Sequence, residues 1–294
     1  MTGSVTYQIE HRTRYGYGGE VNFGSHRLYL YPQAEPNQVV RRFELRTVPE
    51  SRQRWVRDFD GNFLVICNFG LQEARQLLFE VEMVVERPEV NPFDFLLDTE
   101  AVRMPVKYAD EQFRWLEPYC RSSCEDEEPV NLFLAETGLG NGNGEETVDF
   151  LLKINRAIFE RFEYQRRDDE GIQSVAETVA GRVGSCRDFA VCLMAVARHL
   201  GLAARFVSGY VYVEAGESEL GNRALGAMHA WVELYLPGAG WKGFDPTNGI
   251  LVNHSFIATG VSGDPMLVQP TQGRYYSDAK VDAVLETDLM IQTC

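Results

Sequence analysis

Short runs of alternating apolar and polar residues dominate the first part of the chain. The alternation is clear in Val5–Glu10 and looser in Val39–Val48, while residues 63–69 and 77–85 are mostly apolar. A further run ends at Pro32, and Asp58–Asn62 is a cluster of turn-forming residues. Successive side chains of a strand point to opposite faces, and short strands separated by turn signals are typical of antiparallel sandwiches. The pattern predicts an N-terminal antiparallel β-sandwich over residues 1–90, with its aromatic residues in the core.

The pattern changes after Pro88. Residues 91–145 are predicted to form a connector with helices, because helical periodicity appears around Asp110–Cys120. The acidic run 125–128 follows, and we expect it to be a solvated loop. The glycine-rich run 138–144 lacks the preceding strand and the spacing of a phosphate-binding loop. It is interpreted as a flexible loop.

Helical and strand patterns alternate in the last part. Apolar residues recur at helical spacing in Thr147–Phe162 and in Ser185–Leu200. Strand patterns follow at 204–213, 227–236 and 241–245. We therefore expect an α+β domain over residues 146–294, and the whole chain is assigned to the α+β class.

Cys186 is the first candidate for chemistry. Ser185 and Asp188 match a capping box with aspartate in place of glutamate, which makes Cys186 the first residue of a helix that Gly201 ends. A helix N-terminus carries about half a positive charge, and a free thiol with a pKa of about 8.5 needs such help, or a base, to ionise at neutral pH. The position favours a nucleophile.

A base and an orienting group follow at suitable positions. Strict alternation places His229 on the less apolar face of its strand, and the turn 237–240 predicts a hairpin that brings Asp245 beside it. In such a set the imidazole takes the thiol proton while the carboxylate fixes its tautomer. The thiolate could then attack a carboxamide and form a thioester.

Three segments resemble the core motifs of bacterial transglutaminase-like proteins: Gly184–Ala190, Met228–Glu233 and Gly243–Gly249. Two segments, Tyr7–Tyr15 and Asp58–Asn62, resemble the N-terminal β-domain of that family. The resemblance implies a papain-like, transglutaminase-type catalytic core.

That resemblance also implies site residues. It assigns Cys186 as nucleophile, His229 as general base and acid, and Asp245 as the group that orients His229. The backbone N–H of Cys186 is expected to donate to the oxyanion, and Tyr164 and Trp231 are candidates for further oxyanion or substrate contacts. No metal or cofactor is expected, and the partner is a protein or peptide substrate.

Charge and composition narrow the class of partner and compartment. Lys and Arg number 28 against 43 Asp and Glu, a net charge of −15, which disfavours nucleic acids and anionic membranes. The chain lacks a signal-peptide pattern at its start and any run of about 18 apolar residues, so a cytoplasmic location is expected. The six cysteines are irregularly placed, which does not indicate a disulfide framework. The oligomeric state is not predicted.

Other residues have simpler interpretations. Cys192 is expected to be a small core residue of the helix, and Cys120 and Cys124 to be inert thiols. His254 is near enough in sequence to be a rival base.

Three functional hypotheses follow. The first is acyl transfer through a Cys186 thioester, with hydrolysis by a cysteine peptidase or amidase favoured over amine transfer by a transglutaminase. The second is a non-catalytic interaction protein on the same scaffold. The third is a metal hydrolase, which would need bound zinc.

Overall fold

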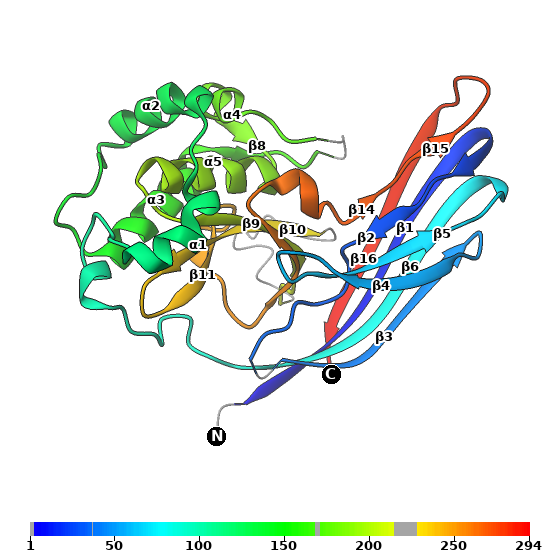
Figure 1. The fold of residues 1–294 in the computed structure, drawn as a ribbon, viewed down its shortest axis with the longest axis horizontal. Helices are drawn as coiled ribbons and strands as arrows, with labels where there is room; N and C mark the ends of the chain where they lie inside the picture. The colour runs from blue at the N-terminus through cyan, green and yellow to red at the C-terminus, as the bar shows by residue number, and fades with distance from the viewer. Residues whose placement is uncertain (1–2, 37, 168–170, 215–227) are drawn as a thin grey trace.

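The computed structural model describes residues 3–36, 38–167, 171–214 and 228–294. Long strands form one domain, and helices around a second sheet form the other (Figure 1). The fold is α+β, as predicted.

The N-terminal domain contains two antiparallel sheets. The first has the order β15-β1-β6-β3, with β16 also paired to β1. Its strands are β1 (Ser4–Phe23), β3 (Val39–Val48), β6 (Glu73–Pro88), β15 (Tyr275–Tyr276) and β16 (Ala283–Thr293). The second has the order β14-β2-β5-β4. Its strands are β2 (His26–Leu28), β4 (Arg52–Arg57), β5 (Phe63–Asn68) and β14 (Thr271–Gln272).

Alternation explains how the two sheets share one core. Ile9 on β1 and Met83 on β6 are buried together with Val65 and Cys67 on β5, while many intervening residues on these strands are partly or fully exposed. The glycines after Tyr15, where the sequence pattern breaks, do not end β1. The strand continues, with a register irregularity against β6 between Gly16 and Val21, a position where glycine tolerates the distortion of a bulge.

The C-terminal strands return to this domain. All eleven residues of β16 have partners on β1, from Ala283↔Tyr17 to Thr293↔Tyr7, and β14 pairs with β2. Residues 271–293 therefore belong to the sandwich sheets and not to the catalytic core that was expected to extend over 146–294. The exposed apolar positions and acidic residues of β16 gave no domain signal, because an edge strand buries little of its surface.

Short helices fill the connector. They are η1 (Thr99–Ala101), α1 (Asp110–Cys120), η2 (Cys124–Asp126) and α2 (Glu127–Thr137). The expectation of an acidic loop at 125–128 is wrong, since these residues form η2 and the first turn of α2. Carboxylates are favoured there because they face the positive end of the helix dipole. Gly138 then caps α2 in the left-handed conformation, with φ of 71°.

The C-terminal domain is built around a five-stranded antiparallel sheet of order β12-β11-β10-β9-β13. Its strands are β9 (Ala204–Val211), β10 (His229–Leu236), β11 (Gly240–Asp245), β12 (Ile250–Leu251) and β13 (Phe256–Ser262). Ala227, the first residue of the strand predicted at 227–236, lies outside the described residues.

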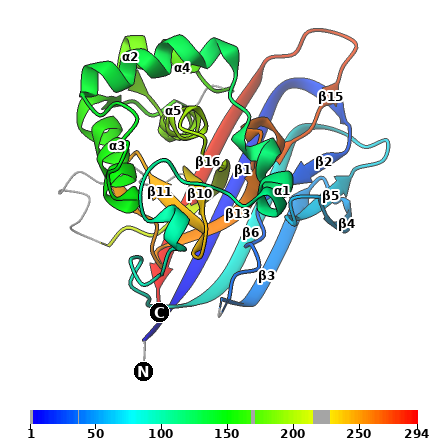
Figure 2. The ribbon, with the colours of Figure 1, turned by 60° about the vertical axis from the view of Figure 1, so that its left-hand side comes forward.

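Helices cover this sheet (Figure 2). They are α3 (Thr147–Arg161), α4 (Val175–Gly181) and α5 (Cys186–His199), and a short parallel pair, β7 (Glu163–Tyr164) and β8 (Val183–Gly184), precedes α5. The apolar stripe of α5, including Phe189 and Leu193, shares a core with Val232 and Leu234 of β10. The final 3₁₀ turn is η4 (Pro265–Val268).

The two domains pack on each other through buried side chains. Tyr29 and Leu64 of the sandwich belong to the core of the C-terminal domain, and Tyr210 of β9 belongs to the core of the sandwich. The Tyr210 hydroxyl lies 3.1 Å from Nδ1 of His11. Burial lowers the pKa of His11 to about 4, so this histidine is neutral at pH 7. Within the described residues, no helix is both long and apolar enough to span a bilayer.

Candidate active site

Cys186 begins α5, as the capping pattern predicted. Ser185 before it is extended, with φ of −91° and ψ of 176°, so the chain turns into the helix at the cysteine. The first backbone N–H groups of a helix have no partner within the helix and carry its partial positive charge. Cys186 is 9% exposed. The thiol is therefore held on a rigid element, close to a positive end, with limited access.

Asp188 fixes the start of this helix. Its side chain is fully buried, and its Oδ2 accepts hydrogen bonds at 2.7 Å from both the N–H and the hydroxyl of Ser185. Its Oδ1 accepts from the N–H of Gln173 at 2.7 Å and from Arg167 at 3.3 Å. One carboxylate thus ties the residue before the nucleophile to the segment that precedes α4.

Gly184 makes this arrangement possible. A Cβ atom placed on Gly184 would lie 2.9 Å from Cβ of Asp188. The glycine directly before the serine cap is thus required by close packing against the buried carboxylate.

His229 and Asp245 come together as the hairpin predicted. Val232 on β10 pairs with Phe244 on β11, so the next residue, Asp245, falls on the same face as His229. Nε2 of His229 lies 2.9 Å from Oδ2 of Asp245, and both side chains are completely buried.

Asp245 is itself held by the turn that follows it. Its Oδ1 accepts from the N–H of Thr247 at 2.9 Å, and its Oδ2 accepts from the side-chain amide of Asn248 at 2.7 Å. Asn248 was not among the site residues predicted from the sequence. The signal was present in the spacing, because an amide three residues after an aspartate in a Pro-containing turn can reach back to its carboxylate.

The electrostatics favour a charged imidazole. Burial by itself lowers the pKa of His229, but the Asp245 carboxylate and the Cys186 thiol raise it, and the net shift is upward. Asp245 occupies Nε2, and Nδ1 is buried without a conventional hydrogen bond. Nδ1 is therefore the ring nitrogen available to exchange a proton with Cys186.

Tyr164 lies close to the nucleophile. It pairs with Gly184 in the β7–β8 ladder. Burial raises its pKa to about 12, and the negative charges of Cys186 and Asp245 contribute to the rise. The hydroxyl thus stays protonated and can donate a hydrogen bond beside Cys186.

Trp231 lies beneath the histidine. The indole ring stacks on the imidazole of His229, with centroids 6.2 Å apart and an interplanar angle of 29°. Phe256 packs edge-on to the indole, with centroids 5.3 Å apart. Its Nε1 is buried and has no hydrogen-bond partner among the described residues. A role for Trp231 in contacting substrate stays a prediction, since only 1% of the side chain is exposed.

The other candidate residues lie elsewhere. Cys192 is fully buried inside α5, where burial raises its pKa to about 12, in agreement with a core role. Burial also raises the pKa of Cys120. In the part of the chain that the structure describes, His, Cys, Asp and Glu form no group of three or more suited to holding a metal ion.

Comparisons with known proteins found matches to both domains. Residues 135–246 match the transglutaminase-like superfamily, and residues 7–86 match the bacterial transglutaminase-like N-terminal region. An uncharacterised protein of Mycobacterium tuberculosis is 28% identical over 295 residues, covering 95% of this chain and 90% of that protein. One from Mycobacterium leprae is 25% identical over 277 residues, covering 94% and 95% respectively.

A solved structure has the same fold. It is described as a putative cysteine protease from Cytophaga hutchinsonii and superposes with a TM-score of 0.73 at 17% identity, over 99% of this chain and 91% of that one. The chain belongs to the transglutaminase-like superfamily and carries the N-terminal region of its bacterial members.

Proposed function

We propose that this chain is a thiol-dependent amidase or peptidase that cleaves a peptide or glutamine carboxamide through a Cys186 thioester. The observation that carries the proposal is the buried His229–Asp245 pair, which leaves Nδ1 of the imidazole for a cysteine at a helix N-terminus. Each group has the partner that its role in thiol catalysis requires.

The first half-reaction forms the thioester. His229 takes the Cys186 proton, and the sulfur attacks the carbonyl carbon, so that a C–S bond forms. The C–N bond then breaks while His229 returns its proton to the leaving nitrogen. The upward shift of the His229 pKa supports this step, because a charged imidazolium stabilises the thiolate and supplies the proton.

The oxyanion needs donors close to the sulfur. The backbone N–H of Cys186 is the first of its helix, and Tyr164 belongs to the neighbouring β7–β8 ladder. We assign these two groups as the oxyanion donors. Preorganised donors of this kind are each worth roughly 10²–10³ in rate.

Water completes the reaction in this proposal. His229, now neutral, takes a proton from a water molecule whose oxygen attacks the thioester carbonyl. The C–S bond breaks, the carboxylic acid leaves, and the thiolate–imidazolium pair is restored. A primary amine in place of water would give the transglutaminase product.

Mass spectrometry with glutamine-containing peptides tests the proposal. The protein is incubated with peptide, with and without a primary amine, and both protein and peptide are weighed. We expect an acyl-enzyme on Cys186 and a hydrolysed peptide. Cys186→Ala should form neither, whereas Cys124→Ala, which removes an exposed thiol, should behave as wild type. If an amine conjugate is the main product, the reaction is transglutamination and not hydrolysis. The absence of any adduct would contradict the proposal.

A further inference from the structure

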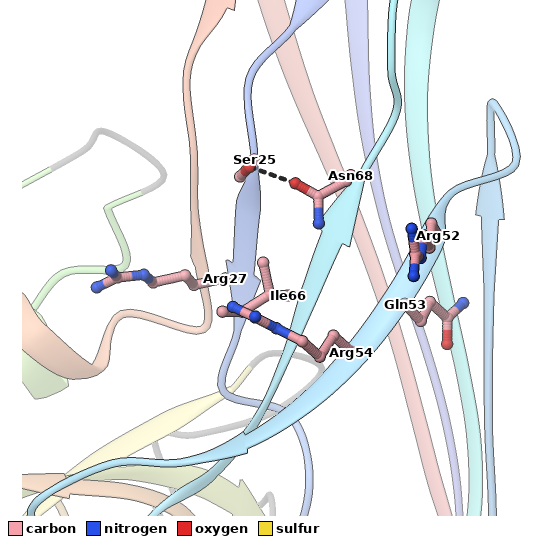
Figure 3. A pocket seen from close by; sticks show the side chains of 7 residues that line it. All are labelled: Ser25, Arg27, Arg52, Gln53, Arg54, Ile66 and Asn68. Atoms are coloured by element: carbon pink, nitrogen blue, oxygen red, sulfur yellow. Dashed lines mark hydrogen bonds between the residues drawn. The ribbon is translucent and has the colours of Figure 1, made fainter.

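A groove on the sandwich domain has an unusual lining. It has a volume of about 660 Å³, and its walls include Arg27, Arg52 and Arg54 together with Ser25, Ile66 and Asn68 (Figure 3). The volume lies within the range of about 300–1,000 Å³ found for small-ligand sites. Three exposed arginines thus gather at one hollow of a protein whose net charge is −15.

Strand register fixes the arrangement of these arginines. Arg27 on β2 and Arg54 on β4 both pair with Ile66 on the strand between them, and Arg52 pairs with Asn68. Neighbouring strands are about 4.7–4.9 Å apart, so the backbones of Arg27 and Arg54 are separated by about 9 to 10 Å. Two guanidinium groups at this spacing can contact the same extended segment.

The arginines of the other sheet differ in one respect. Arg12, Arg14 and Arg41 of the first sheet pair with Glu80, Glu286 and Glu86 across the strands. The side chains of the three groove arginines make no ion pair or hydrogen bond with any residue that the structure describes. The interaction drawn in Figure 3 joins Ser25 to Asn68. Like charges gathered on one face of a sheet repel each other, and an anion between them removes that repulsion.

The groove lies on the side of the sandwich that meets the catalytic domain. Leu64 on β5 and Val56 on β4 share the face of Ile66 and Arg54, and Tyr29 directly follows β2. All three pack with the core of the C-terminal domain. Arg27 extends toward that domain in Figure 3.

The strand that carries His229 also reaches the sandwich. Met228, the neighbour of His229, packs against the sandwich core. The groove and the start of the His229 strand thus both adjoin the contact between the two domains.

We propose that this groove binds the carboxylate side chains of an acidic peptide segment in the substrate that is acylated onto Cys186. That the bound peptide is a substrate rests on the proposed function. A guanidinium binds a carboxylate in a two-point geometry that an ammonium lacks. Asn68 and Ser25 add neutral hydrogen-bonding groups, and Ile66 supports the aliphatic stems between them.

Peptide binding to the inactive Cys186→Ala protein tests the proposal without requiring turnover. The probes are two fluorescein-labelled peptides, one with a glutamine flanked by glutamates and one with the glutamates replaced by glutamines. Fluorescence anisotropy gives Kd for each. We expect the acidic peptide to bind more tightly, with an affinity that falls as salt is raised.

Variants locate the site. In the Cys186→Ala background, Arg27→Gln with Arg54→Gln should weaken binding of the acidic peptide about ten-fold, from two charge pairs worth up to about five-fold each. Arg12→Gln with Arg14→Gln, on the first sheet, makes the same change in net charge and should have little effect. All four arginines are exposed, so thermal melting should show every variant folded.

Three outcomes would overturn the inference: equal affinity for the two peptides, equal weakening by both arginine pairs, or stronger competition from a polynucleotide than from an acidic peptide of matched charge. The proposed function fails separately. Binding of the acidic peptide through Arg27 and Arg54 without any Cys186 adduct would support the groove and contradict the proposed enzymatic function. Equal acylation by acidic and neutral peptides would support the enzymatic function and contradict the groove.

Discussion

The candidate active site and the arginine groove both gather polar groups, but they differ in how far the protein itself satisfies the hydrogen-bonding capacity of these groups. The carboxylate of Asp245 receives hydrogen bonds from His229, Thr247 and Asn248, all inside the protein. The arginines of the groove face solvent without a partner among the described residues. The comparison indicates that the reacting groups are held in place before substrate arrives, whereas the groove is completed by a ligand.

The largest effect should follow from removing the nucleophile. Cys186→Ala should reduce kcat/KM for a glutamine peptide by roughly 10⁴-fold or more, on the scale of nucleophile deletions in triad enzymes. The groove should still bind peptide with unchanged Kd, which separates the two regions. Residual activity within ten-fold of wild type would show that another group performs the reaction.

Loss of the orienting carboxylate should come next. Asp245→Asn keeps the shape of the side chain but removes the charge that raises the His229 pKa, so kcat should fall by about 10³–10⁴-fold with little change in KM. Asn248→Ala should lower kcat by only about ten-fold, because the other two hydrogen bonds to Asp245 remain. Equal losses in the two variants would contradict the assigned order of importance.

Replacing the buried Asp188 should lower the stability of the protein more than replacing an exposed arginine does. Asp188→Asn leaves Arg167 without its buried partner and removes acceptors from Ser185, which should lower the free energy of unfolding by about 2 to 4 kcal/mol. Urea denaturation measures the change. Arg182→Gln, which breaks an exposed pair with Glu136, is the control and should change stability by about 1 kcal/mol or less.

The pH dependence of stability should carry the signature of His229. Its pKa is higher in the folded protein than the ordinary value of about 6.5, so the extra stability is fully present below about pH 6.5 and is lost as pH rises through the folded value. The difference in unfolding free energy between wild type and His229→Gln should therefore be largest near pH 6 and shrink at alkaline pH. A difference that grew with pH would mean that the histidine is held neutral.

The sequence predicted the parts of this structure that depend on local pattern. Cys186 follows a recognisable cap, and alternation in one hairpin suffices to place His229 beside Asp245. The candidate site residues could be predicted from the sequence because they lie in short segments whose backbone geometry follows from local pattern.

Features that depend on distant contacts could not be predicted in this way. β16 pairs with β1 across more than 250 residues, and no local signal marks that choice. The groove combines Arg27 with Arg52 and Arg54 only through strand register. The role of Asn248 shows only once the Asp245 carboxylate is seen to be buried. The sequence indicated Asp188 as a cap, but not its contacts with Gln173 and Arg167.

The rate at which iodoacetamide alkylates Cys186, measured against pH in wild type and His229→Ala, tests the central claim most directly. Mass spectrometry of the Cys186 peptide reports the reaction, with the exposed Cys124 as an internal reference in the same sample. The thiolate–imidazolium pair predicts that Cys186 reacts readily well below pH 8, far faster than Cys124, and that His229→Ala abolishes this advantage. A Cys186 that reacts no faster than Cys124, or whose rate is indifferent to His229, would contradict the account.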